Sequence, residues 1–217
     1  MKKKTFFIMI LVLVITTIPL LANAATLEYN ENFSIRGGIG YGSSKEQVSQ
    51  IEKNNGSVLK NDWDDVMEQL YGIKKSDLRY NTVLAGHDVL IYHYFNSQNE
   101  LEEFHYCLTP ETYKDITPSL IEKYGEAQFQ GDNRAPFSTK ALAEYEAFKG
   151  IGEKVSLYDY RGWLLQYNDC YVLIEAANSN VISVINYHFI SYEEMEETID
   201  LLKEADTAKK ESIKNDI

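Results

Sequence analysis

The spacing of hydrophobic residues predicts helices followed by strands in the first half of the chain. Ser44 and Gln47 form a capping-box pattern ahead of an apolar helical face that includes Val48 and Ile51. A second apolar stripe follows, and alternating runs then predict three strands. The expected elements are helices over 44–55 and 62–71 and strands over 78–84, 88–95 and 100–108.

The second half of the chain has a similar order of elements. Thr109 before Pro110 is typical of an N-cap followed by proline at the first helical position, and it predicts a helix that ends at Tyr124. Pro118 inside this helix predicts a kink, or a restart with Thr117 as the new cap. The later elements expected are helices over 139–149 and from 191 onward, and strands over 154–160, 163–167, 170–177 and 181–190, with a turn at Arg161-Gly162. Ser191 and Glu194 form another capping-box pattern at the start of the last helix.

The first 24 residues have the pattern of a signal peptide. Three lysines precede an apolar run, and Ala22-Asn23-Ala24 is a small-residue cleavage site. An uncleaved membrane anchor is the alternative, but Thr16, Thr17 and Pro19 leave the run short for a span of about 20 residues. We therefore expect cleavage near Ala24, and a secreted or extracytoplasmic protein without membrane attachment after cleavage.

A polar, turn-rich stretch over 125–138 is the best internal boundary. It separates a helix–helix–meander–helix half, 25–125, from a helix–meander–helix half, 126–217, and the two could still form one compact domain. The expected fold class is α+β, with helices packed on one or more antiparallel β-meander sheets. Two similar halves and two unrelated halves both stay open, because the alignment of Phe104 with Ile185, Tyr106 with Tyr187 and Leu108 with Phe189 rests on few identities.

Alternation along the strands assigns two faces to the expected sheets. One face is apolar and is expected to pack against the helices. The other mixes tyrosine and aliphatic residues with histidine and glutamate, which is typical of a protein-binding surface, although a covered second face is the simpler alternative. In the assumed register His93 lies opposite Glu102. The candidate binding residues are Tyr92, Tyr94, Leu101, Glu103, His105, Leu164, Tyr171, Leu173 and His188.

Composition narrows the range of partners. The chain carries 21 lysines and arginines against 33 aspartates and glutamates, a formal charge of −12. Nucleic acids and anionic polymers would be repelled, so a basic or mixed-charge protein surface is the expected partner. A hydrophobic content of 44% excludes general disorder.

Motifs for catalysis or for metal binding are absent from the sequence. Neither G-x-S-x-G nor H-E-x-x-H occurs, and the spacing of Asp62, Asp64 and Asp65 is not that of a calcium loop. We expect no cofactor and no metal. His105 and Cys107 are the one pair that could serve a hydrolase, since both lie on the mixed face.

Two cysteines in an exported chain suggest a disulfide between Cys107 and Cys170. The face assignment argues against it, because it places the two thiols on opposite faces. Both states stay open on sequence grounds.

Residues 33–48, FSIRGGIGYGSSKEQV, resemble the entry segment of small exported proteins of the β-lactamase-inhibitor-protein and SmpA/OmlA (BamE-like) type. Gly42, Ser44 and Val48 stand approximately in the family's G-x-[ST]-x-x-x-V frame, and the second half has no matching motif. The resemblance implies a binding scaffold. The expected function is therefore a secreted, non-catalytic protein-interaction or inhibitor-like module; an extracellular hydrolase and a glycan-binding accessory protein are the alternatives.

Overall fold

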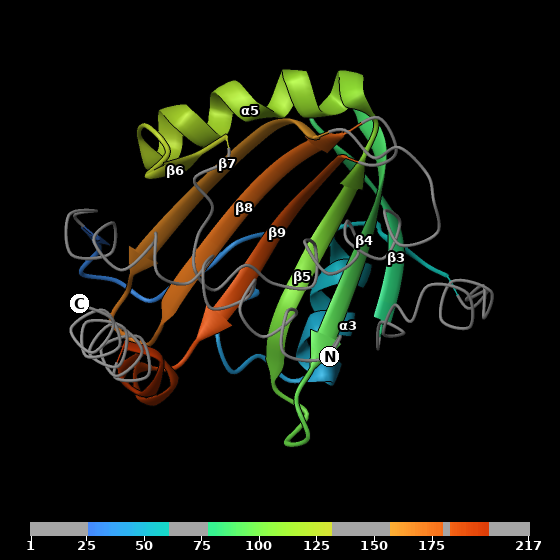
Figure 1. Ribbon diagram of the computed structural model, residues 1–217. Coiled ribbons are helices and arrows are strands. Elements are labelled where there is room, and N and C mark those ends of the chain that lie inside the picture. The colour runs from blue at the N-terminus through green and yellow to red at the C-terminus, as the bar shows by residue number, and fades with distance from the viewer. Residues whose placement is uncertain (1–25, 61–77, 132–156, 180–182, 200–217) are drawn as a thin grey trace, which may run out of the picture.

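The computed structural model describes residues 26–60, 78–131, 157–179 and 183–199, and these ranges form one mixed sheet of nine strands (Figure 1). Eight strands lie in the order β1-β7-β8-β9-β5-β4-β3-β2, and β6 pairs with β7. The strands are β1 Leu27–Glu28, β2 Val58–Leu59, β3 Leu78–Leu84, β4 His87–Phe95, β5 Leu101–Leu108, β6 Phe129–Gln130, β7 Leu157–Gln166, β8 Tyr171–Ser179 and β9 Ser183–Ile190.

The expected α+β class, with helices on small meander sheets, is wrong. The protein is dominated by strands and built on one large mixed sheet, in which β1 runs parallel to β7 and the other pairs are antiparallel. The pairing of β5 with β9 joins the two halves of the chain, as Figure 1 shows at the centre of the sheet. Pairing between segments so far apart in sequence leaves no local signal, which is why the sequence suggested separate meanders.

Strands β5 and β9 pair antiparallel at the centre of the sheet, with His105 opposite Asn186, Phe104 opposite Tyr187 and Tyr106 opposite Ile185. Helices lie on both faces of the sheet: α5 packs on one face, whereas Met195 of the helical segment 192–199 packs on the other.

Helix α3, Lys45–Asn54, begins as the sequence predicts. The Ser44 side chain accepts from the Gln47 amide, and the Gln47 side chain accepts from the Ser44 amide at 2.8 Å, so the capping box is confirmed.

Helix α5, Pro110–Tyr124, also has its predicted cap at Thr109. It continues through Pro118, so the alternative of a restart at Thr117 is wrong. Pro118 has no N–H, so the Lys114 carbonyl lacks its helical hydrogen-bond donor. Lys114 and Pro118 both lie on the exposed side of the helix, where water can donate to this carbonyl instead.

One expected turn is part of a strand. Arg161 and Gly162 lie in the middle of β7, where Gly162 faces Glu175 on one side and Phe129 on the other. A Cβ at position 162 would come within 3.3 Å of the Phe129 side chain. This glycine therefore permits the close approach of β6 rather than a change of chain direction.

The main core lies between the sheet and helices α3 and α5, and a smaller cluster lies on the opposite face beneath the helical segment 192–199. None of the described helices is long and apolar enough to cross a membrane. The predicted helices over 62–71 and 139–149 and the predicted signal peptide fall outside the described residues.

Candidate functional site

Most of the binding residues expected from sequence are buried. Six of the nine have at most 5% of their surface exposed: Tyr94, Leu101, Glu103, His105, Leu164 and Leu173. Tyr92, Tyr171 and His188 are half-buried. In this conformation the second face offers little surface to a partner, and its role in binding stays a prediction.

The buried second face contains a polar row across the central strands. Glu103 Oε1 accepts from Asn186 Nδ2 at 2.8 Å and lies 2.9 Å from His105 Nε2. On β8, Glu175 Oε1 accepts from Tyr160 OH at 2.7 Å. Buried polar groups in such contacts stabilise one register over its alternatives, because a shifted strand would leave them without partners.

The structure does not bring the one catalytic pair suggested by sequence into contact. His105 pairs with Glu103, and neither of its described contacts is with Cys107. No disulfide joins Cys107 to Cys170, since the two lie on opposite faces of the sheet. Burial first, and then the charge of Asp169, raise the pKa of the Cys170 thiol, which makes it a poor nucleophile.

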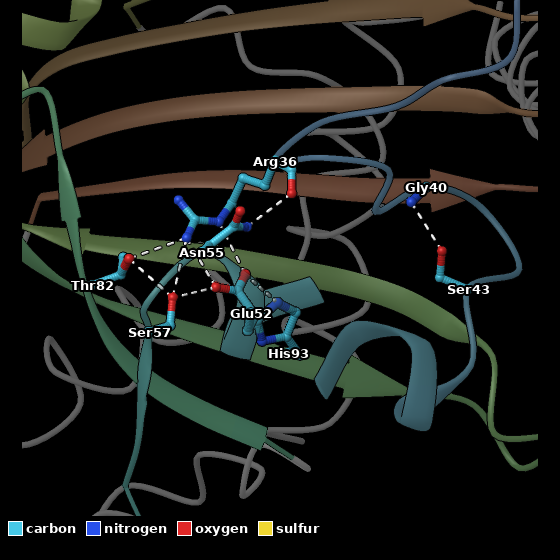
Figure 2. Close-up of polar contacts among 8 residues, drawn as sticks. All are labelled: Arg36, Gly40, Ser43, Glu52, Asn55, Ser57, Thr82 and His93. Atoms are coloured by element: carbon cyan, nitrogen blue, oxygen red, sulfur yellow. Dashed lines mark hydrogen bonds and ion pairs between the residues drawn. The ribbon is translucent and has the colours of Figure 1, made fainter. Parts of the chain in front are cut away.

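A second polar cluster lies within the main core, and Figure 2 shows its contacts. Arg36 Nε and Nη2 donate to the two carboxylate oxygens of Glu52, each at 2.9 Å, and Nη2 also donates to Thr82 Oγ1 at 3.1 Å. Ser57 Oγ donates to Glu52 Oε2 at 2.5 Å. His93 Nε2 lies 3.6 Å from Glu52 Oε1, longer than a hydrogen bond.

We call this cluster of Arg36, Glu52, Ser57, Thr82 and His93 the clamp. Burial alone would raise the pKa of Glu52, but the neighbouring His93, Arg36 and Ser57 together lower it to about 2. Burial lowers the pKa of His93 despite the nearby carboxylate. Glu52 and His93 have no exposed surface. The cluster therefore joins α3 and the loop before it, residues 33–44 (the entry loop), to the sheet rather than meeting a substrate.

Sequence reasoning missed this clamp and paired His93 with Glu102 instead. The actual partner of His93 across β4 and β5 is Phe104, two residues further along the strand. The sequence did contain a signal for the burial of Glu52, because this residue lies four positions after Val48 and therefore on the buried side of the helix.

Two exposed tyrosines lie toward the end of the sheet where β8 begins and β9 ends: Tyr41 is 39% exposed and Tyr192 is 37% exposed. We call these two residues and the half-buried Tyr171 the tyrosine patch. The rings of Tyr171 and Tyr192 meet edge to face, with centroids 5.1 Å apart. Of these residues, sequence reasoning named only Tyr171.

Local structure fixes the rings of the tyrosine patch. Tyr192 is the first residue of the helical segment 192–199, and its hydroxyl donates to the Tyr167 carbonyl. The predicted capping box at Ser191 is present: the Ser191 amide donates to Glu194 Oε2 at 2.8 Å, and the Glu194 amide donates to Ser191 Oγ at 3.1 Å. Figure 1 shows this helix at the end of the sheet, following β9.

Tyr41 stands on a loop that requires a glycine beside it. A Cβ on Gly40 would lie 2.3 Å from the Phe33 carbonyl oxygen. The Gly40 amide donates to Ser43 Oγ at 3.0 Å, as Figure 2 shows. The loop therefore holds Tyr41 at a defined position rather than on a free tip.

Carboxylates lie near the tyrosine patch. Glu28 and Tyr171 pair with Gln166 from its two sides, Glu196 lies one helical turn after Tyr192, and Asp169 precedes Tyr171 by two residues. We call Glu28, Glu100, Asp169, Glu194 and Glu196 the acidic rim. Partial burial raises the pKa of Tyr171, as do its neighbours Tyr192, Glu28 and Glu196. Partial burial also raises the pKa of Tyr41, with further contributions from Glu194, Glu100, Cys170 and Asp169. Tyr41 and Tyr171 therefore each have carboxylates nearby.

Comparison with known proteins adds no further assignment: the chain matches no protein family, no curated protein and no solved structure. Within the described ranges, no three histidine, cysteine, aspartate or glutamate residues gather closely enough to hold a metal ion.

Proposed function

We propose that the mature chain is an exported, non-catalytic protein-interaction module that binds its partner through the tyrosine patch. The observation that carries this proposal is the exposure of Tyr41 and Tyr192 on fixed backbone, with the ring of Tyr171 against that of Tyr192. Tyrosine offers a large contact area and loses little conformational entropy on binding, which is why it is enriched at protein interfaces.

The location of the patch also supports the proposal. Its residues come from the loop before α3, the start of β8 and the helical segment after β9, and all of these are anchored to the sheet. Rigid elements preserve the arrangement of the rings without a partner, so binding does not have to order them.

A competing surface lies at the opposite edge of the sheet. Val58 and Val83 are each 61% exposed and Leu59 is 47% exposed, on β2 and β3. This edge is more apolar than the tyrosine patch, and it provides a matched location for control variants.

The proposal is tested by affinity capture with the tagged mature protein, residues 25–217, from culture medium and cell extract of the source organism. Wild type, a Tyr41→Ala/Tyr192→Ala double variant and a Val58→Ala/Val83→Ala control are compared. We expect a stoichiometric protein partner that the tyrosine variant loses and the control retains. Equal capture by all three, or a loss confined to the control, would contradict the proposal. Circular dichroism confirms that each variant is folded.

A further inference from the structure

We infer that the tyrosine patch recognises a basic polypeptide segment, whose lysine or arginine side chains stack on the tyrosine rings while their charges meet the acidic rim. This inference rests on the proposed function and gives the chemistry of the partner. It combines two independent observations: rings without a cation over them, and carboxylates near those rings.

Other tyrosines of this protein already have a cation over the ring. The Arg79 guanidinium lies 5.6 Å from the ring centroid of Tyr92, and Lys123 Nζ lies 4.9 Å from that of Tyr124. In the part of the chain that the structure describes, no lysine or arginine takes this position over any of the three tyrosines of the patch. The rings of Tyr41 and Tyr192, each more than a third exposed, are therefore accessible to a cation from another molecule.

The acidic rim is formed by several separate parts of the chain. Glu28 lies on β1, Glu100 precedes β5, Asp169 lies in the β7–β8 turn, and Glu194 and Glu196 lie in the helical segment after β9. Carboxylates at such spread positions suit several cationic side chains along a segment better than a single ion. The chain's formal charge of −12 adds a long-range attraction for a basic partner and repels an acidic one.

The test measures fluorescence anisotropy with fluorescein-labelled decalysine and decaarginine, and with decaglutamate as the negative control. We expect both basic peptides to bind, with a Kd that rises with salt, and decaglutamate not to bind. Tyr41→Ala/Tyr192→Ala leaves the net charge unchanged and should raise the Kd about two- to fivefold for each ring removed. Tyr41→Phe retains the ring at a position where the hydroxyl makes no described hydrogen bond, and should bind like the wild type.

A charge-matched control separates a local site from diffuse attraction to an acidic protein. Glu194→Gln/Glu196→Gln removes two charges from the rim, and glutamine can still serve the capping box. Glu111→Gln/Glu122→Gln removes two charges from α5. We expect the rim variant to weaken binding by at least threefold more than the α5 variant.

Equal weakening by the two charge variants, or no effect of the tyrosine variant, would overturn the inference. Failure of the basic peptides to bind, while protein capture still depends on Tyr41 and Tyr192, would also overturn it but leave the proposed function standing. If capture does not depend on the tyrosines either, the proposed function fails as well.

Discussion

The guanidinium of Arg36 and the carboxylate of Glu52 form a two-point ion pair inside the protein, with both contacts at 2.9 Å. Arg36 comes from the entry loop, where its φ is +47°, and Glu52 comes from helix α3. The pair therefore connects two segments that contact the sheet from one side, and the left-handed backbone of Arg36 is maintained by the contacts of its side chain.

Removal of one partner of this pair should be costly. We expect Glu52→Gln to lower the free energy of unfolding by about 3 kcal/mol, because it leaves Arg36 buried with its charge unpaired. Urea denaturation followed by circular dichroism measures the change. Glu111→Gln, on the surface of α5, should leave the urea midpoint unchanged. A double variant, Arg36→Met/Glu52→Leu, should be less destabilised than Glu52→Gln; if it is more destabilised, the pair stabilises the fold by more than the cost of its burial.

The stability of the protein should fall as the medium becomes acidic. The pKa of Glu52 is about 2 in the folded protein against 4.5 for the unperturbed group, so the unfolded chain takes up this proton first. The stabilisation that the ionised Glu52 carboxylate gives the folded protein is therefore complete above about pH 4.5, and it is lost as the pH falls toward 2. The pKa of His93 is also lowered, which adds a loss of stability below pH 6.5.

Thermal unfolding at a series of pH values between 7 and 3 measures both effects. We expect Tm to decrease continuously. We expect His93→Gln to flatten the curve just below pH 6.5 and, because His93 also helps to lower the pKa of Glu52, to reduce the decrease at lower pH. A Tm that rises on acidification would contradict the protonation states assigned to the clamp.

Two neighbouring glycines should differ in their tolerance of alanine. A Cβ at Gly40 would meet the Phe33 carbonyl oxygen at 2.3 Å, whereas a Cβ at Gly42 would meet no atom within 4 Å. Gly42 has a φ of +73°, so Gly42→Ala should cost about 1 kcal/mol through backbone strain. We expect Gly40→Ala to destabilise more and to displace Tyr41, which urea denaturation and binding by the patch would report. Equal tolerance of the two substitutions would show that the loop is not held as described.

The two cysteines should react separately. Intact mass under non-reducing conditions should show two thiols and no loss of two hydrogens, since no disulfide is formed. A maleimide should label only Cys107, which is half-buried, in the folded protein; Cys170 should react after denaturation, because it has no exposed surface and a raised pKa. A mass two hydrogens lower than that of the reduced protein would contradict this arrangement.

The sequence predicted those elements whose signals are local. The caps at Ser44, Thr109 and Ser191 were correct, because each depends on side chains within three residues of the helix start. The alternation of the strands also assigned Phe104 and His105 to the correct faces of β5.

Features that depend on distant contacts could not be predicted. Gly162 looks like a turn residue until β6 is seen against it, and Arg36 meets Glu52 only after the loop folds over α3. The tyrosine patch has the same origin, because Tyr41, Tyr171 and Tyr192 come from three segments that converge only at the end of the assembled sheet. Tyr171 alone stood in a strand pattern, and the other two had no periodic context.

Site-specific photo-crosslinking tests the central claim most directly. A benzophenone amino acid replaces Tyr192, Tyr41 or, as the control, Val83, and each mature protein is irradiated in culture medium and cell extract of the source organism. The account predicts one protein adduct of the same mass from positions 41 and 192 and none from position 83. An adduct from position 83 alone, or the absence of any adduct from 41 and 192, would contradict a partner bound at the tyrosine patch.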